Sequence, residues 1–91
     1  MYKITPYSFF QAKKLNVDIK PSYKTGKKID VYKNGRYITS IGDINYLDYP
    51  TYIKKYGLRY AMNRRRLYKL RNYKTGSVKN TPAFYSYNIL W

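Results

Sequence analysis

Residues 60–71 read YAMNRRRLYKLR, a stretch that combines strong helix formers with five basic side chains and no acidic one. Alanine, methionine, leucine and arginine all favour helix, and neither glycine nor proline interrupts the run. We therefore predict a helix from residue 58 to residue 72, which would be the main helix of a small domain.

The apolar side chains of this helix fall on two opposite sides when they are placed at about 100° per residue. Leu58 and Met62 lie on one side, and Leu67 and Leu70 lie roughly opposite. A helix with two apolar sides is predicted to pack between other elements, so that its arginines emerge along the edges.

Further helix starts are indicated by an N-cap residue followed by proline in the first turn. Thr5 precedes a predicted helix over 6–15, and Asp48 or Tyr49 caps one that stops at Gly57. Thr81 begins a last short element in the same way.

The apolar residues near both ends of the chain are expected to reach the core. In the first helix we expect Phe9 and Phe10 to be buried. The sequence ends in Ile89-Leu90-Trp91, which is predicted to dock into the core as part of a short helix or strand.

A β-hairpin is predicted at the centre of the chain. Residues 29–33 and 36–42 are rich in aromatic and β-branched side chains, and Asn34-Gly35 separates them. Asn-Gly between two such runs is the strongest short-range hairpin signal. Residues 17–21 are predicted to be extended, because the residue before a proline avoids the helical region.

The tetrapeptide Tyr-Lys-Thr-Gly occurs twice, at 23–26 and at 73–76. The flanking residues do not match, so this is not an internal repeat. We predict that both copies are turns and that 73–80 is a turn-rich connection.

These elements predict one α+β domain over 1–91, with a central β-hairpin and three to four short helices. The chain has 91 residues and 14 tyrosines, which favours an aromatic core with hydroxyl groups that reach the surface. The tyrosines expected in this core are Tyr32, Tyr37, Tyr52 and Tyr68.

Charge is the most informative property of the composition. There are 19 lysines and arginines against four acidic residues, for a net charge of +15. Codon usage in an AT-rich genome could account for part of the lysine and tyrosine content, but it does not explain the complete lack of glutamate. Since such an excess costs stability through self-repulsion, it indicates a polyanionic partner, nucleic acid before an anionic membrane surface.

Catalysis is poorly supported by the residue types. The chain has neither histidine nor cysteine, so it has no ordinary catalytic triad, thiol nucleophile or thiolate metal site. Asp43 and Asp48 could in principle hold a metal, but a turn role for Asp43 and a capping role for Asp48 explain both more simply. We expect no enzyme activity, no metal and no cofactor.

No apolar stretch approaches the roughly 18 residues of a membrane span, and the first ten residues lack the features of a signal peptide. We therefore expect an intracellular or packaged protein with no membrane partner.

Basic residues interleaved with tyrosines are the main functional signal, because lysine and arginine neutralise phosphates. Arg65 is expected to form an ion pair with Asp43 or Asp48 instead. The predicted phosphate contacts form two groups, one on the main helix and one on the hairpin, which could share one face. They are Arg59, Arg64, Arg66, Lys69 and Arg71 on the helix, and Lys27, Lys28, Lys33 and Arg36 on the hairpin.

Three segments carry a resemblance to a known family: Ile41-Gly42-Asp43, the run DYPTYI at 48–53 and the run RRRLYK at 64–69. Together with the terminal Leu90-Trp91, they make the chain similar to an uncharacterised family of small basic proteins of large nucleocytoplasmic DNA viruses. The resemblance implies a viral origin and a compact α+β domain, and it supplies no catalytic residues.

Two functions are therefore expected. The first is largely sequence-independent nucleic-acid binding, to DNA rather than RNA, linked to organisation or packaging of a viral genome. The alternative is a minor capsid or virion structural (cement) protein that contacts other virion proteins. A homo-oligomer is compatible with both. The expected location is the virion, the host nucleus or a cytoplasmic virus factory.

Overall fold

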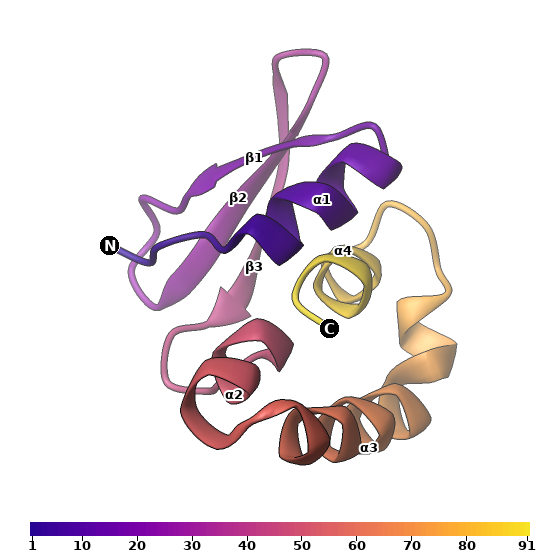
Figure 1. The fold of residues 1–91 in the computed structure, drawn as a ribbon. Helices are drawn as coiled ribbons and strands as arrows, with labels where there is room; N and C mark the ends of the chain where they lie inside the picture. The colour runs from indigo at the N-terminus through magenta and orange to yellow at the C-terminus, as the bar shows by residue number, and fades with distance from the viewer.

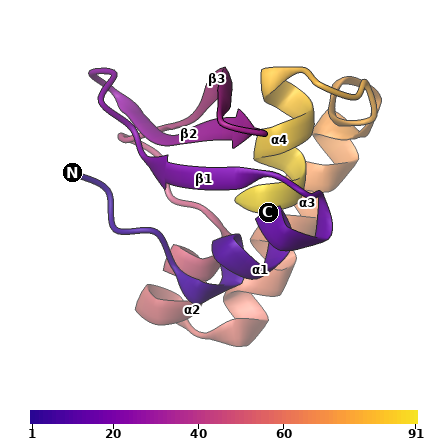
Figure 2. The same ribbon diagram turned by 90° about the horizontal axis from the view of Figure 1, so that it is seen from above.

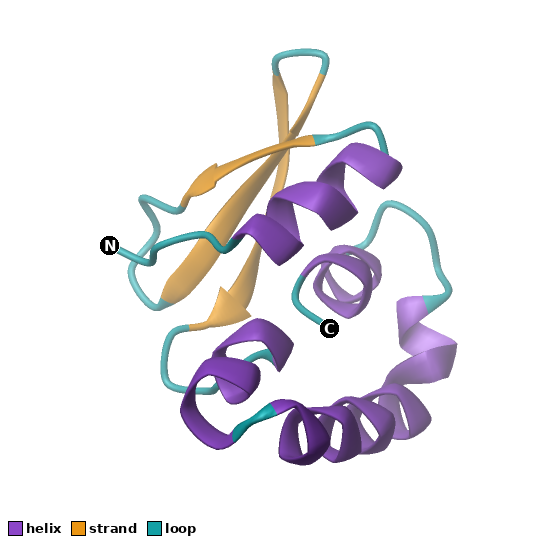
Figure 3. Ribbon diagram, in the orientation of Figure 1, coloured by secondary structure: helices purple, strands orange, loops and turns teal.

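Four helices and a three-stranded antiparallel sheet make up the fold of the computed structural model, which describes residues 1–91 (Figures 1 and 3). The predicted α+β class with a central hairpin is confirmed. In chain order the elements are α1 (Pro6–Lys14), β1 (Asp18–Pro21), β2 (Lys27–Lys33), β3 (Arg36–Asp43), α2 (Tyr49–Tyr56), α3 (Leu58–Gly76) and α4 (Pro82–Ile89).

The sheet has the order β1-β2-β3, and its hairpin forms where Asn34-Gly35 predicts it. Both turn residues have positive φ, 53° for Asn34 and 77° for Gly35, as a type I′ turn requires. Lys33 pairs with Arg36 across the turn, and the register shifts once, between Val31 and Tyr32.

The short helices begin at the predicted caps. The side chains of Thr5, Asp48 and Thr81 each accept a hydrogen bond from the backbone N–H three residues further on, at 3.3, 3.0 and 3.2 Å. Each cap satisfies one of the donors that a helix leaves unpaired at its start. Gly57, at φ 92°, separates α2 from α3 as predicted.

Helix α4 holds the two halves of the molecule together. It contacts β3, α1 and α3, and it therefore lies between the sheet and α3 (Figures 1 and 2). Ile89 and Leu90 are no more than 1% exposed, so the predicted docking of the C-terminal residues into the core is confirmed. Burying each such side chain contributes about 1.5–3 kcal/mol.

Helix α3 runs four residues further than predicted, to Gly76. The second Tyr-Lys-Thr-Gly copy, at 73–76, is therefore helical, and only the copy at 23–26 lies in a turn. The turn prediction for 73–76 was wrong because a glycine at the end of a helical run can close the last turn rather than stop the helix before it.

Gly76 is packed so closely that a side chain would not fit. A Cβ atom there would lie 2.4 Å from Cδ2 and 2.9 Å from Cβ of Tyr87. Because the Tyr87 Cβ atom cannot swing away from its own backbone, we expect Gly76→Ala to lower the free energy of unfolding by about 1–3 kcal/mol. Urea denaturation measures this, with the exposed neighbour Thr75→Ala as the control. If Gly76→Ala and Thr75→Ala lower the free energy of unfolding equally, the close packing of Gly76 against Tyr87 is contradicted.

Helix α3 is not packed between other elements, and the prediction of two buried sides was wrong. It packs mainly against α2 and α4, and its outer side faces solvent. Ala61 is fully buried, whereas Leu58, Met62 and Leu70 are 55%, 55% and 62% exposed. None of the other six elements of residues 1–91 covers the outer side.

The predicted burial of Phe9 and Phe10 was also wrong, since both side chains are at least half exposed. Helix α1 instead buries Ser8 and Ala12. The hydroxyl group of Ser8 donates a hydrogen bond of 2.9 Å to the carbonyl oxygen of Ile89, which turns this side of α1 toward α4.

Most tyrosines lie around the core and not in it. Of the four predicted core tyrosines, Tyr37 is exposed and the other three are half-buried. Tyr85 is the tyrosine that fills the interior, at 2% exposed, and its hydroxyl group donates to Asn80. The core itself is aliphatic, centred on Ile29 and Ile41.

Candidate nucleic-acid interface

Only one ion pair exists in the protein. It joins Nζ of Lys28 to Oδ2 of Asp48 at 2.9 Å, with both side chains almost fully buried. A second aspartate, Asp30, is also buried and accepts hydrogen bonds from Ser22 and Ser40. Of the 19 lysines and arginines, 18 are therefore left without a carboxylate partner.

The ion pair belongs to a structural network at the start of α2. Asp48 caps this helix and also accepts a hydrogen bond of 2.7 Å from the Tyr2 hydroxyl group. Burial acts to raise the pKa of Asp48, but hydrogen bonding from Thr51 and the charge of Lys28 outweigh it and hold the pKa below its ordinary value. Burial, with a smaller effect of Asp48, raises the pKa of Tyr2.

Lys28 therefore has a structural role. This corrects the prediction that it contacts a phosphate. Its ammonium group donates to Asp48 and, at 2.6 Å, to the carbonyl oxygen of Tyr46. A group only 4% exposed with both partners in place cannot reach a phosphate without breaking this network. Both faces of β2 are covered here, since Lys28 to Val31 are all buried, and the loop before α2 supplies both partners of Lys28.

Helix α3 is the predicted main helix, and it carries the five phosphate contacts that were predicted there. Arg59, Arg66 and Arg71 are exposed, and Arg64 and Lys69 are half-buried. The guanidinium group of Arg64 lies 5.5 Å from the centroid of a tyrosine ring of α2, and Arg66 donates to an asparagine one turn earlier.

Arg65 has a structural role, although not the predicted one. Its Nε donates a hydrogen bond of 2.6 Å to the carbonyl oxygen of Trp91, and its guanidinium group lies 5.1 Å from the centroid of the Tyr49 ring. The hydroxyl group of Tyr7 donates to the same carbonyl oxygen. The predicted ion pair with an aspartate is not formed, and Arg65 instead ties α3 to the C-terminal segment.

Lys69 is held against Tyr87. Its Nζ lies 4.1 Å from the centroid of that ring and donates a hydrogen bond of 3.2 Å to the Tyr87 carbonyl oxygen. Burial, and then the neighbouring charge of Arg65, lower the pKa of Lys69 to about 8.

This shift predicts a pH-dependent stability. Between pH 8 and about 10 the unfolded chain binds a proton at Lys69 that the folded chain does not bind, because an unperturbed lysine has a pKa of about 10.4. The free energy of unfolding therefore rises with pH in this window. We expect Lys69→Met to remove this rise in urea titrations from pH 7.5 to about 9.5. The matched variant Lys74→Met, on the exposed end of α3, should keep it.

The predicted hairpin contacts do not form one site. Lys27, Lys33 and Arg36 are exposed, but only the last two, at the turn, line a groove of about 530 Å³ with Asn80. Lys27 pairs with Asp43 at the open end of the hairpin. The tip of the hairpin lies at the opposite end of the molecule from α3 (Figure 1). Lys33 and Arg36 therefore do not share one face with the arginines of α3, because α4 lies between the sheet and α3.

The positive charge surrounds the molecule. Exposed lysines or arginines occur on all three strands and on α1, α2 and α3, and α4 is the one element that carries no charged residue. Helix α3 carries more lysines and arginines than any other of these elements, and it has no acidic residue.

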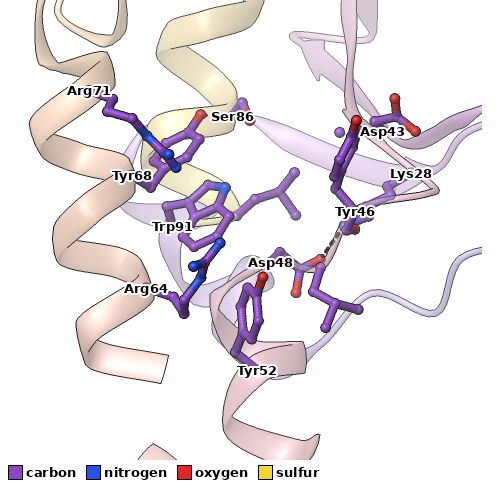
Figure 4. Close-up of a pocket in the computed structure, with 13 residues that line it drawn as sticks. Lys28, Asp43, Tyr46, Asp48, Tyr52, Arg64, Tyr68, Arg71, Ser86 and Trp91 are labelled. Carbon is purple, nitrogen blue, oxygen red and sulfur yellow. Dashed lines mark hydrogen bonds and ion pairs between the residues drawn. The ribbon is translucent and has the colours of Figure 1, made fainter. Parts of the chain in front are cut away.

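A pocket of about 280 Å³ lies between α3 and the loop that joins β3 to α2 (Figure 4). Arg64 and Arg71 reach it from α3, and Tyr46 reaches it from the loop. Its wall includes Trp91, whose ring stacks on that of Tyr68 with centroids 4.3 Å apart and planes 7° apart.

No pattern in the sequence predicts this pocket. The seven-residue spacing of Arg64 and Arg71 places them on one side of α3 and was the one available signal. Tyr46 and Trp91 could not be found, because the fold brings them to α3 from distant parts of the chain.

The two aspartates that could have suggested a metal have structural roles, as predicted. Asp48 caps α2, and Asp43 accepts a hydrogen bond of 2.8 Å from the backbone N–H of Asn45 in a turn. No group of three or more potential metal-binding side chains occurs. None of the helices combines the length and apolar character needed to cross a bilayer.

Comparison of the chain with protein-family models, with curated proteins and with solved structures gives no match. The resemblance to small basic viral proteins therefore stays a prediction that rests on the sequence motifs.

Proposed function

We propose that this chain binds nucleic acid through its phosphates, with little dependence on base sequence, and that it helps to organise or package a viral genome. The observation that carries the proposal is the single ion pair, which leaves 18 cationic groups without a carboxylate. A phosphate backbone neutralises such groups and releases its condensed counterions, which drives binding without reading the bases.

Helix α3 is proposed as the principal contact surface. Arg59, Arg66 and Arg71 are exposed on it, and no acidic residue lies in the helix. Arginine is favoured for such contacts because its planar donors pair with phosphate oxygens two at a time. DNA is the proposed polymer because the family that the sequence resembles belongs to DNA viruses.

The distribution of charge favours organisation of a genome over recognition of one site. Cationic groups stand at the hairpin tip and on α3, at opposite ends of a molecule 36 Å long (Figure 1). One molecule could therefore contact two segments of nucleic acid at once and draw them together.

Fluorescence anisotropy with labelled random-sequence duplex DNA tests the role of α3. Replacing Arg59, Arg66 and Arg71 with glutamine is expected to make the slope of log affinity against log salt less steep by about 3, close to one unit for each lost phosphate contact. The matched control replaces Lys13, Lys14 and Lys20, which removes the same charge from the α1–β1 side. Equal changes in both triple variants would contradict α3 as the principal surface.

A virion structural role is the second candidate, and exposed apolar side chains favour it. Phe9 and Phe10 on α1, and Leu58, Met62 and Leu70 on the outer side of α3, could meet another protein. The C-terminal residues could not, since they fill the core of their own chain. This candidate is favoured if the protein binds DNA no more tightly than a lysine peptide of equal charge.

A further inference from the structure

The two arginines of the pocket have neither a hydrogen-bond nor an ion-pair partner, a property that they share on α3 with Arg59 outside the pocket. Arg65 and Arg66 each donate a hydrogen bond to a protein oxygen, whereas Arg64 and Arg71 form neither a hydrogen bond nor an ion pair. They stand two helical turns apart on the side of α3 that lines the pocket, with Arg71 beside Tyr68 and Arg64 beside Trp91 (Figure 4). Two guanidinium groups without an acceptor on one wall of a pocket are suited to bind an anionic ligand.

Arg64 also carries the one buried side-chain polar atom of the protein without a partner. Its Nε is shielded from solvent and has no hydrogen-bond acceptor. A buried N–H group without an acceptor makes this position of the Arg64 side chain less stable. The side chain could leave the position without losing a hydrogen bond to the protein. A ligand oxygen in the pocket would supply the acceptor that the protein lacks.

Aromatic rings also line the pocket. Tyr46, at the mouth, is 71% exposed, and its ring pairs with no other aromatic ring of the protein. Trp91 lines the pocket beside Leu90, with the Tyr68 ring stacked on it. Flat apolar rings beside arginines are the combination with which proteins bind unpaired bases and their phosphates.

The charges of the pocket set the orientation of a ligand. The two arginines are on the α3 side, while Asp43, at the end of β3, and Asp48, at the start of α2 and paired with Lys28, line the other side (Figure 4). A phosphate group is attracted to the arginines on the α3 side and repelled by the aspartates on the other side. A volume of about 280 Å³ is near the lower limit of small-molecule sites, so it suits one nucleotide and not a duplex.

We infer that this pocket binds one unpaired nucleotide of a nucleic-acid strand, with its phosphate on Arg64 and Arg71 and its base against Tyr46 and Trp91. The inference rests on the proposed nucleic-acid binding and adds to it a contact that only a single-stranded or unpaired region can make.

Tryptophan fluorescence reports on this pocket directly, because Trp91 is the one tryptophan of the chain. Single-stranded oligothymidylate is expected to quench its emission and to bind more tightly than duplex DNA of equal length at the same salt concentration. Thymidine monophosphate is expected to give the same quenching at a higher concentration, because it lacks the neighbouring phosphates. Equal affinity for the mononucleotide and the oligonucleotide would overturn the assignment to a strand.

Two double variants of equal charge separate the pocket from the general surface. Arg64→Gln with Arg71→Gln is expected to abolish the quenching and to weaken single-strand binding about 10- to 100-fold more than the control, Arg59→Gln with Arg66→Gln. The control pair has the same seven-residue spacing on α3, outside the pocket. Circular dichroism should show both variants folded, since neither pocket arginine forms a hydrogen bond or an ion pair with the protein.

Tyr46→Ala tests the base separately from the phosphate. It is expected to weaken single-strand binding about 5- to 100-fold while duplex binding stays unchanged, because stacking on an exposed ring serves only an unpaired base. If both double variants weaken single-strand binding equally and the quenching persists, the pocket assignment fails while the proposed function stands. If the wild-type protein binds no nucleic acid of any kind, the proposed function itself fails.

Discussion

Asp48→Ala is expected to lower the free energy of unfolding by about 3–5 kcal/mol, because it leaves a buried charge without its partner. Lys28 is only 4% exposed, so its ammonium group cannot turn to water when the carboxylate is removed. The same substitution removes the acceptor of the Tyr2 hydroxyl group and the N-cap of α2. One side chain thus joins the N-terminal segment, the sheet and α2.

Urea denaturation of three variants separates these contributions. Asp18→Ala, at an exposed aspartate, should change the stability by no more than about 0.5 kcal/mol. The double variant Lys28→Met with Asp48→Asn removes both charges and keeps a residue suited to the cap, so it should be considerably more stable than Asp48→Ala. If the double variant is as unstable as Asp48→Ala, the buried charge is not the source of the loss.

The affinity for random-sequence duplex DNA is expected to fall by about 10³-fold or more between 50 and 200 mM salt. If six to eight phosphates are neutralised, log affinity plotted against log salt should have a slope of about −5 to −7. The physical reason is the release of condensed counterions, which is less favourable when the bulk solution already holds many ions. No other property of the protein is expected to respond so strongly to solution conditions.

Anisotropy titrations at four or more salt concentrations measure this slope. Duplexes of different sequence should give the same slope and similar affinities, because phosphates carry no sequence information. A slope near zero, or a strong preference for one sequence, would show that base contacts dominate binding and would contradict phosphate neutralisation as the mechanism.

The features that could be predicted from sequence are those that neighbouring residues determine. The Asn34-Gly35 turn needs positive φ at both positions, which few residues adopt, so it places the hairpin unambiguously. The caps at Thr5, Asp48 and Thr81 likewise depend on a side chain and a backbone N–H three residues away. Such signals are independent of the rest of the fold.

The features that could not be predicted depend on contacts between distant segments. Phe9 and Phe10 are exposed because Ser8 bonds to Ile89, which lies 81 residues further along the chain. Lys28 is buried because a loop 20 residues away supplies its carboxylate.

In the candidate nucleic-acid interface, too, only the features that neighbouring residues determine could be predicted. The arginines of α3 could be identified from their local density. The separation of the hairpin cations from α3, and the pocket that Tyr46 and Trp91 line, follow from the position of α4 between the sheet and α3. No local pattern in the sequence contains that information.

The thermal unfolding midpoint, measured with and without random-sequence nucleic acid at low salt, tests most directly whether the fold builds a surface for phosphates. If the fold arranges the cations into a surface for phosphates, the ligand binds the folded chain in preference to the unfolded one. At a concentration about 100-fold above the dissociation constant, the midpoint should then rise by about 10–20 °C. An unchanged or lowered midpoint would show that the unfolded polycation binds equally well, and would contradict a nucleic-acid surface built by this fold.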